Sequence, residues 1–442
     1  MLKSFLGGVH PRAKKELASG SPIRSLYPGG DFIFLTNQHI GAPAVPCVKV
    51  GDRVLVGQTL CEAGGFVSAD ILSSVSGTVK EIGPHICQNG ESATAVVVTS
   101  DGEFEKVPGW GEKRDWESMT TEETVAAVRK AGIVGMGGAG FPTAVKLTPK
   151  DPSKIDYVIC NGSECEPYIT CDHRLMLEKP ERAVLGMRIV MRMFPGSKGV
   201  FGIENNKKDG IASVRAAAAQ YGDISVVALR EKYPQGGERV IIHSLTGRKV
   251  NSGMLPADAG CLVFNFSTLC AIADAVCDGI PLVRRVVTVS GEAINEPSNF
   301  DAPIGMSAED IIAAAGGYKA EPSKIIFGGP MMGAAVYRLD IPVTKTTSCI
   351  LAISEDETTQ YSPMECIRCG KCLTTCPERL MPIKLKNAAD EGEYGEFEKL
   401  HGMECIGCGC CTYICPAKRR ISQSIAIAKR QIIIERKAGR KK

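Results

Sequence analysis

Two cysteine runs near the end of the chain share one spacing. Residues 366–377 read CIRCGKCLTTCP and residues 405–416 read CIGCGCCTYICP, so each run is Cys-x2-Cys-x2-Cys-x3-Cys-Pro. A cubane iron–sulfur cluster needs four thiolates around one small volume, and a tight loop supplies three of them. In two-cluster ferredoxins the fourth cysteine of each run binds the other cluster. The spacing therefore predicts two 4Fe–4S clusters with crossed ligands.

The crossed arrangement assigns eight cysteines as ligands. One cluster is predicted to use Cys366, Cys369, Cys372 and Cys415, and the other Cys405, Cys408, Cys411 and Cys376. Pro377 and Pro416 restrict the backbone after each crossing ligand, and Cys410 falls outside the spacing. The alternative is structural zinc in a non-enzymatic scaffold. Zinc sites favour cysteine pairs separated by longer gaps, often with histidine, so iron–sulfur clusters are the stronger prediction.

A glycine-rich loop lies far upstream of the cysteines. The segment GMGGAG matches G-x-G-x-x-G through Gly135, Gly137 and Gly140. In a Rossmann fold such a loop follows a strand, whereas this one follows a predicted helix whose start has capping-box spacing at Thr120 and Glu123. Taken alone, the loop is a weak signal, and a plain helix connection is the simpler interpretation.

Three segments together change that interpretation. GMGGAGFPTAVK, NGSECEP and FNFSTL resemble the flavin-binding subunit of respiratory NADH dehydrogenase, complex I. The resemblance implies that these segments hold FMN, with NADH over its ring. It carries over as cofactor-binding residues Gly135, Gly137, Gly138, Gly140, Phe141, Lys146, Asn161, Glu164, Glu166, Asn265 and Thr268.

The resemblance also implies roles for these residues. The glycines let the backbone approach the flavin, and Lys146 places a positive charge near its phosphate or ring. Asn161 bonds the edge of the isoalloxazine ring. Asn265 and Thr268, at a predicted helix start, bind the FMN phosphate through side chains and free backbone amides.

The remaining implied contacts involve the nicotinamide nucleotide. Phe141 stacks on the adenine, while Glu164 and Glu166 orient flavin and nicotinamide, with Glu166 as the catalytic residue. The plain alternative for both carboxylates is a solvated loop. The family usually has arginine where Met136 stands, so one charged nucleotide contact is unaccounted for. Glu238, in YPQGGER, lies where the family also has acidic residues, in a poorer local match.

The elements that must position these motifs indicate a multidomain α/β chain. Residues 28–110 resemble the barrel-sandwich fold of biotinyl and lipoyl carriers, without a lysine at the tip GFVSADILSS. Residues 115–280 form a parallel α/β domain for FMN and NADH, because strand-like runs flank the helix around IASVRAAAAQYG. We expect a β-grasp module at 283–345, an α-rich two-cluster ferredoxin-type domain at 355–425 and a basic tail at 426–442. The segment SQSIAIAKRQIIIERK is helix-like and ends in the basic residues RKAGRKK.

Composition limits the remaining possibilities. The 442 residues carry a net charge of only +3, which does not indicate a nucleic-acid-binding protein. No apolar run approaches the ~18 residues of a membrane span, and the first residues do not resemble a secretory signal. We therefore expect a cytoplasmic protein. Ten of the 19 cysteines lie outside the two runs and are expected to be small buried apolar residues.

The order of the predicted parts, with GGVHP, NQHIGAP, VSGTV and MGGAGFPTAVKL, resembles the RnfC family, the C-type subunits of Rnf ion-translocating oxidoreductase complexes. That resemblance implies electron transfer between NADH or NAD⁺ and ferredoxin, coupled to ion translocation. It implies other Rnf subunits as partners, ferredoxin bound through one of them, and a peripheral place on the cytoplasmic face of the membrane. The alternative is the cobalamin reductase of microcompartments, which usually begins near the glycine loop. The related A-type subunit of the sodium-pumping quinone reductase lacks the cysteine runs.

Overall fold

A four-stranded parallel sheet lies at the centre of the computed structural model, which describes residues 2–356 and 360–439. Its strands follow the order β11 (Ile224–Leu229), β10 (Lys198–Glu204), β9 (Tyr157–Gly162) and β12 (Cys261–Asn265). Helix α5 (Lys208–Ala218) connects β10 to β11, which confirms the predicted β-α-β unit. The chain leaves β9 toward β10, and β12 lies on the other side of β9. The sheet therefore has a topological switch point between β9 and β12.

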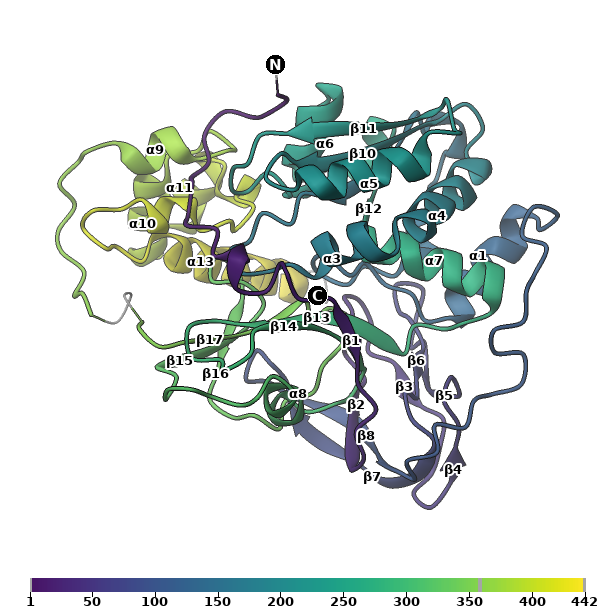
Figure 1. Ribbon diagram of the computed structural model, residues 1–442. Helices are drawn as coiled ribbons and strands as arrows, with labels where there is room; N and C mark the ends of the chain where they lie inside the picture. Colours follow the sequence, from purple (N-terminus) through teal and green to yellow (C-terminus); the bar gives the residue numbers. More distant parts are fainter. Residues whose placement is uncertain (1, 357–359, 440–442) are drawn as a thin grey trace.

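Helices cover both faces of this sheet (Figure 1). They are α1 (Thr121–Lys130), α2 (Thr143–Lys146), α3 (Cys171–Glu178), α4 (Pro180–Met193), α6 (Glu238–Thr246) and α7 (Phe266–Asp278), besides α5. Successive strand residues point to opposite faces, so Val158 and Cys160 join the main core with α4 and α7, whereas Ile159 packs with α6. The start of α7 is thereby fixed at the carboxyl edge of β12.

A six-stranded mixed sheet follows along the chain. Its order is β1 (Ile23–Ser25), β14 (Ser298–Pro303), β13 (Arg284–Ser290), β17 (Cys349–Ile353), β15 (Lys324–Phe327) and β16 (Ala334–Val336). Helix α8 (Ala308–Ala314) is capped by Ser307, whose hydroxyl accepts a hydrogen bond from the Asp310 N–H at 3.1 Å. The predicted β-grasp range of 283–345 thus supplies four of the six strands. The edge strand β1 comes from the N-terminal segment.

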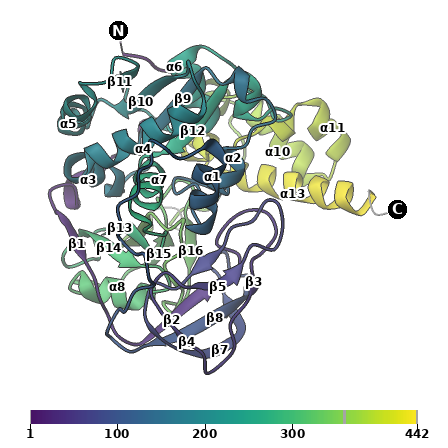
Figure 2. The same cartoon turned by 90° about the vertical axis from the view of Figure 1, so that its right-hand side faces the viewer.

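Two small antiparallel sheets form the barrel-sandwich part. One contains β2 (Asp31–Leu35), β8 (Ser92–Ser100), β7 (Gly77–Ile86) and β4 (Arg53–Val54), and the other β3 (Val45–Pro46), β5 (Thr59–Glu62) and β6 (Ile71–Leu72). Alternate residues Phe32 and Phe34 of β2 are buried with Leu60 and Ile71. This core continues into that of the parallel domain, so the barrel-sandwich packs directly beneath it (Figure 2).

Helices make up the cysteine domain. Four are short, α9 (Lys371–Thr375), α10 (Pro382–Asp390), α11 (Tyr394–Lys399) and α12 (Cys410–Tyr413), and the fifth, α13 (Ile421–Gly439), is long. Helix α13 continues through the predicted boundary at residues 425 and 426, and its Ala428 and Ile432 are buried with Leu385 and Phe397. The helix predicted from SQSIAIAKRQIIIERK is therefore confirmed, and the first half of the segment assigned to the basic tail belongs to this domain (Figure 2).

The N-terminal segment ties the cysteine domain to the parallel domain. The Gly8 N–H donates to Thr375 O at 2.7 Å, and Val9 exchanges backbone hydrogen bonds with Tyr233 at 2.8 and 2.9 Å. In Figure 1 this segment, in purple, passes between the two domains. Within the described ranges, no helix has the length and apolar character that crossing a bilayer requires.

Close packing of α4 on α7 depends on a glycine. A methyl group at Gly186 would overlap Leu269 O, which is backbone that cannot move aside. We predict that Gly186→Ala lowers the free energy of unfolding of the parallel domain by about 1–3 kcal/mol, because the added methyl group would overpack this contact. Gly222→Ala is the matched control, since a methyl group there meets no atom within 4 Å. Thermal unfolding of both variants measures the difference, and equal melting temperatures would contradict the packing argument.

Candidate functional site

The glycine loop is a protruding turn with exposed backbone. Its base is closed by a bridge between Val134 and Pro142 and by the Gly135 N–H, which donates to Phe141 O at 2.9 Å. At the tip, Gly137 and Gly138 are exposed, and a methyl group on Gly138 would meet no atom within 4 Å. Such a bare backbone lets a ligand approach closely, as the sequence resemblance implied.

The loop lies against the start of α7. The Met136 N–H donates to Thr268 Oγ1 at 3.0 Å, and a methyl group on Gly137 would lie 2.9 Å from Asn265. Asn265 caps α7, because its Oδ1 accepts from the Ser267 N–H at 2.9 Å, while its Nδ2 donates to Asp172 at 2.6 Å. The structure thus brings Asn265 and Thr268 to the glycine loop across more than a hundred residues of sequence.

The motifs meet at the switch point of the parallel sheet. Asn161, the last residue but one of β9, pairs with Asn265 at the end of β12, and ligands of open α/β sheets bind at this edge. The Asn161 side chain donates to Gly236 O at 2.7 Å. Lys146 reaches the same edge, where its Nζ donates to Val263 O at 2.7 Å and lies 3.5 Å from Glu238. Glu238 therefore does belong to this region.

Glu164 faces the protein interior. Its side chain is 3% exposed, its Oε1 accepts from the Asp172 N–H at 2.7 Å, and Lys15 Nζ lies 3.8 Å from its Oε2. Burial raises the pKa of Glu164, and Lys15 and Lys207 counteract that rise. The solvated-loop alternative is therefore wrong for this residue. Its implied contact with flavin stays a prediction, since the described hydrogen bonds are structural.

Glu166 is largely buried beneath a loop of the six-stranded part. Its Oε2 accepts from the Met331 N–H at 3.1 Å, and a methyl group on Gly329 would overlap that oxygen. Its other oxygen, Oε1, has no hydrogen-bond partner in the described part of the chain. Burial raises the pKa of Glu166 to about 7, although the backbone N–H groups of Met331 and Met332 lower it. A buried acid of this kind is typical of a functional site.

Sequence reasoning missed several charged residues here. Lys15 Nζ donates to Glu166 O at 3.0 Å, and Lys207 Nζ donates to Ser163 O at 2.7 Å. Arg285 donates to Met136 O at 2.8 Å. A fourth missed residue is Asp172. It lies only five residues after the NGSECEP motif, so the sequence could have indicated it. The two lysines and the arginine come from distant segments that carry no motif.

The two cysteine runs fold as a repeat. Arg368 and Gly370 in the first run have positive φ, as do Gly407 and Gly409 at the equivalent places of the second. A short helix, α9 or α12, follows each pair and ends near the crossing cysteine. The repeated spacing thus produces two loops of the same backbone shape. Their left-handed positions turn the cysteines of each loop toward one side.

The thiols group as the crossed assignment requires. Burial raises the pKa of Cys372, and the Cys415 and Cys369 thiolates raise it further. In the second group burial raises the pKa of Cys411 to about 12, with further rises from its neighbours Cys408, Cys405 and Cys376. Cys376 therefore lies with the second run and Cys415 with the first. The Leu380 N–H points at Cys376 Sγ at 3.4 Å, which is a donor suited to a thiolate ligand.

Among residues 2–356 and 360–439, no three His, Cys, Asp or Glu side chains meet closely enough to hold one ion. In a cubane cluster each thiolate binds a different iron atom, so its ligands need not approach one point. The assignment of the eight cysteines to two clusters stays a prediction.

The second thiol group lies against the flavin motifs. Cys408 and Cys410 are buried in one apolar cluster with Val9 and Tyr233, and Cys165 and Met331 pack on it. Cys410 Sγ lies 3.8 Å from Tyr233 O. This cluster joins the cysteine domain to the loops that carry Asn161 and Glu166.

The first thiol group faces outward. Cys366 and Cys369 are exposed, whereas Cys376, Cys408 and Cys411 of the second group are buried. Among the ten cysteines outside the runs, eight are buried as expected, Cys165 is half-buried and Cys47 is exposed. The expectation of burial is therefore wrong for Cys47.

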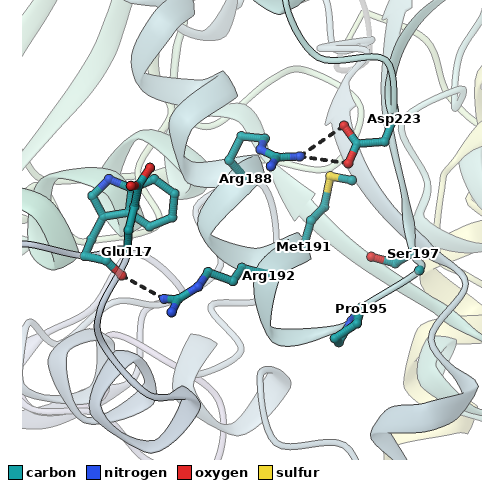
Figure 3. A pocket seen from close by; sticks show the side chains of 9 residues that line it. Glu117, Arg188, Met191, Arg192, Pro195, Ser197 and Asp223 are labelled. Carbon is teal, nitrogen blue, oxygen red and sulfur yellow. Dashed lines mark hydrogen bonds and ion pairs between the residues drawn. The ribbon is translucent and has the colours of Figure 1, made fainter.

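A hollow of about 360 Å³ lies elsewhere on the parallel domain (Figure 3). Arg188 pairs there with Asp223 at 2.7 Å, and Arg192 donates to the carbonyls of Trp116 and Met119 at 2.8 Å. Asp223 immediately precedes β11, so this hollow lies at the amino ends of the strands. The motifs lie at the carboxyl ends, where cofactors of such sheets bind, and the hollow is therefore separate from the candidate site.

Comparison with known families agrees with this geometry. The chain matches the RnfC barrel sandwich hybrid domain at residues 3–103 and the Nuo51 FMN-binding domain at 128–274. It matches the SLBB domain at 286–335 and a 4Fe-4S dicluster domain at 365–418. The fold and site define an electron-transfer protein with an FMN-binding domain and a domain for two 4Fe–4S clusters.

Two curated relatives cover nearly the whole chain. The C-type subunit of the proton-translocating ferredoxin:NAD⁺ oxidoreductase complex of Clostridium ljungdahlii is 45% identical over 90% of this chain and 86% of its own length. Its counterpart in the Na⁺-translocating complex of Acetobacterium woodii is 41% identical over 99% and 98%. The chain belongs to this family, the RnfC subunits of ion-translocating ferredoxin:NAD⁺ oxidoreductases. An NAD⁺-reducing NiFe hydrogenase structure shares the fold, with a TM-score of 0.50 and 20% identity over 66% of this chain and 55% of that chain.

The role of Glu166 in NADH oxidation can be tested by replacing its carboxyl group with an amide, which does not ionise. We predict that Glu166→Gln slows NADH oxidation by roughly a hundredfold and leaves the iron content unchanged. Below its pKa of about 7 the wild-type side chain is protonated and neutral, like glutamine. The ratio of wild-type to variant rate should therefore rise as the pH increases through 7. Glu309→Gln, at an exposed position, is the control. If the ratio of wild-type to Glu166→Gln rate did not depend on pH, the ionisation of Glu166 would have no part in the reaction.

Crossed ligation can be tested by pairs of variants. We predict that Cys369→Ser and Cys415→Ser abolish the same cluster signal in electron paramagnetic resonance, and that Cys376→Ser abolishes the other. Each variant should retain about half of the iron. Since Cys366 and Cys369 are exposed, the iron left in Cys376→Ser should be removed by chelators faster than that left in Cys415→Ser. Cys410→Ser should retain both signals. Loss of one signal in both Cys369→Ser and Cys376→Ser would show uncrossed ligation.

Proposed function

We propose that this chain exchanges electrons between NAD(H) and the other subunits of its Rnf complex. FMN would lie at the glycine loop, the cluster of Cys376, Cys405, Cys408 and Cys411 next to it, and the other cluster at the surface. The observation that carries the proposal is the apolar contact between Cys408, Cys410 and Tyr233. It places the second cysteine run against Cys165, which lies on the NGSECEP segment proposed to face the flavin.

The residues at the sheet edge are proposed to bind and orient the flavin. The exposed backbone of Gly137 and Gly138 would accept it closely, while Thr268 and Asn265 hold the loop against α7. When bound, FMN supplies two-electron hydride chemistry with NAD(H), and 4Fe–4S clusters supply single-electron transfer. We propose that Glu166, on the NGSECEP segment after Asn161, reaches the flavin and that, with its pKa near 7, it can hold or release a proton there.

The cysteine domain is proposed to connect the flavin site with partner subunits. Around the exposed Cys366 and Cys369, the side chains of Met364, Ile367 and Leu373 are 59%, 66% and 47% exposed. Apolar groups gathered at an exposed redox centre are typical of a protein contact. We propose that another Rnf component covers this surface and that ferredoxin exchanges electrons through such a component.

Membership of an ion-translocating family supports a place on the membrane. We propose that the chain is a peripheral subunit on the cytoplasmic face and that its partners carry out ion translocation. Coupling would then depend on electron transfer through the exposed cluster, because that is the redox site nearest to the surface of the cysteine domain.

The proposal is tested by anaerobic purification of the full chain. We expect about eight iron atoms, about eight sulfides and one FMN per chain. Addition of NADH should bleach the visible absorbance of the clusters as well as that of the flavin. Metal-containing protein without acid-labile sulfide would contradict the proposal. So would a chain loaded with FMN and clusters whose clusters NADH does not reduce.

A further inference from the structure

A buried arginine lies directly behind the glycine loop. Arg285, on β13 of the six-stranded sheet, is 2% exposed. Its Nη2 donates to Met136 O at 2.8 Å, and its Nε donates to Thr347 O at 3.1 Å. Its third group, Nη1, is buried and has no hydrogen-bond partner in the described part of the chain. Such an unsatisfied buried donor indicates a missing partner.

A second buried cation supports the other end of the loop. Lys345, 1% exposed, donates through Nζ to Gly132 O at 2.7 Å and to Asp70 O at 2.5 Å. The next residue, Thr346, packs against the loop so closely that a methyl group on Gly140 would lie 2.9 Å from it. The loop is thus held from behind at both ends by the six-stranded part of the chain.

The hydrogen bonds just described bring neither side chain a counter-charge, because each ends on the uncharged carbonyl oxygen of a backbone peptide. Burial lowers the pKa of Lys345 to about 7 against the opposing effect of Asp70 and Cys61, so Lys345 can lose its charge by giving up a proton. An arginine has no such alternative, and burying a cation without a counter-charge is unfavourable. The case for a bound anion therefore depends on Arg285. The neighbouring Arg284 shows the usual solution, because its Nε donates to the Asp301 carboxylate at 2.8 Å. The region behind the loop is therefore suited to one further negative charge.

The additional charge belongs at the inner end of the loop. Arg285 and Thr268 hold the carbonyl and the N–H of the same residue, Met136. Arg285 therefore lies beside the amino end of α7, where the helix dipole also favours an anion. The Asp172 carboxylate already accepts there from Asn265 Nδ2 at 2.6 Å and from Ser267 Oγ at 2.7 Å, whereas Arg285 Nη1 has no hydrogen-bond partner among the described residues. A phosphate bound at this point would be held between the guanidinium, the helix and the loop backbone.

We propose that Arg285 binds the phosphate of the flavin nucleotide through Nη1. The inference rests on the proposed function, in which FMN lies at the glycine loop. The diphosphate of NAD(H) offers the same chemistry, but the flavin phosphate is favoured because Arg285 lies at the buried base of the loop, away from its exposed tip. Arg285 thus makes the six-stranded part of the chain a component of the flavin site.

The experiment compares FMN with riboflavin, which lacks the phosphate. The full chain is stripped of flavin anaerobically, and dissociation constants for both compounds are measured from flavin fluorescence. We expect Arg285→Gln to weaken FMN binding roughly 10- to 100-fold, because it loses a charged hydrogen bond, while riboflavin binding changes much less. Arg285→Lys, which keeps the charge, should recover part of the difference. Arg284→Gln is the matched control and should keep the wild-type ratio of the two constants.

Three outcomes would overturn the inference. Equal losses of FMN and riboflavin would mean that Arg285 only shapes the loop, and unchanged constants would mean that it does not act on the flavin. A loss confined to NADH would assign it to the diphosphate. If Arg285→Gln loses its iron or unfolds, Arg285→Lys provides the same comparison with a smaller FMN-specific loss expected. Failure of the wild-type chain to bind FMN would instead contradict the proposed function.

Discussion

Contact between the cysteine domain and the carboxyl edge of the parallel sheet is the interaction on which the function of the other parts depends. Its centre is apolar, with Cys408 and Cys410 buried against Tyr233. Its rim is polar, and Arg239 lies 2.9 Å from Glu404 there. Partly exposed ion pairs contribute little free energy, so burial of the apolar centre provides most of the stability. The rim pair fixes which faces meet.

The N-terminal segment reinforces this contact from outside. It hydrogen-bonds to Thr375 in the cysteine domain and to Tyr233 in the parallel domain through consecutive residues, Gly8 and Val9. Gly7 has φ of +86°, and a methyl group on it would lie 2.8 Å from Cys376 O, so glycine is required at this crossing. A segment outside both domains thus holds the second thiol group in place beside the flavin motifs.

The parts of the site that the sequence could predict are those with local chemistry. Cysteine spacing specifies cluster ligands without knowledge of distant contacts. The glycine loop alone is a weak signal, and its link to Asn265 and Thr268, 132 residues from Met136 in the case of Thr268, came from the family resemblance. Arg285, 149 residues from its partner Met136, has no such signal, and its neighbour Arg284 is identical in type. Helix α13 was predicted from its sequence, but the domain boundary within it was placed too early. Ile421, Ile425, Ala428 and Ile432 are spaced as one helical face, so the sequence also indicated that the helix packs on the cysteine domain beyond residue 425.

The repeat in the cysteine domain explains Cys410, the one cysteine of the two runs that is not an expected ligand. Cys410 in the second run corresponds to Lys371 in the first, and both follow a glycine with positive φ. Lys371 is exposed and Gly370 has no atom near its missing side chain, whereas Cys410 is fully buried and Gly409 faces Met331 O at 3.3 Å. A lysine at position 410 would bury an unpaired charge against Tyr233. The two loops have the same backbone shape but differ where the second one packs on the flavin domain. There the small, apolar side chain of Cys410 takes the place of Lys371.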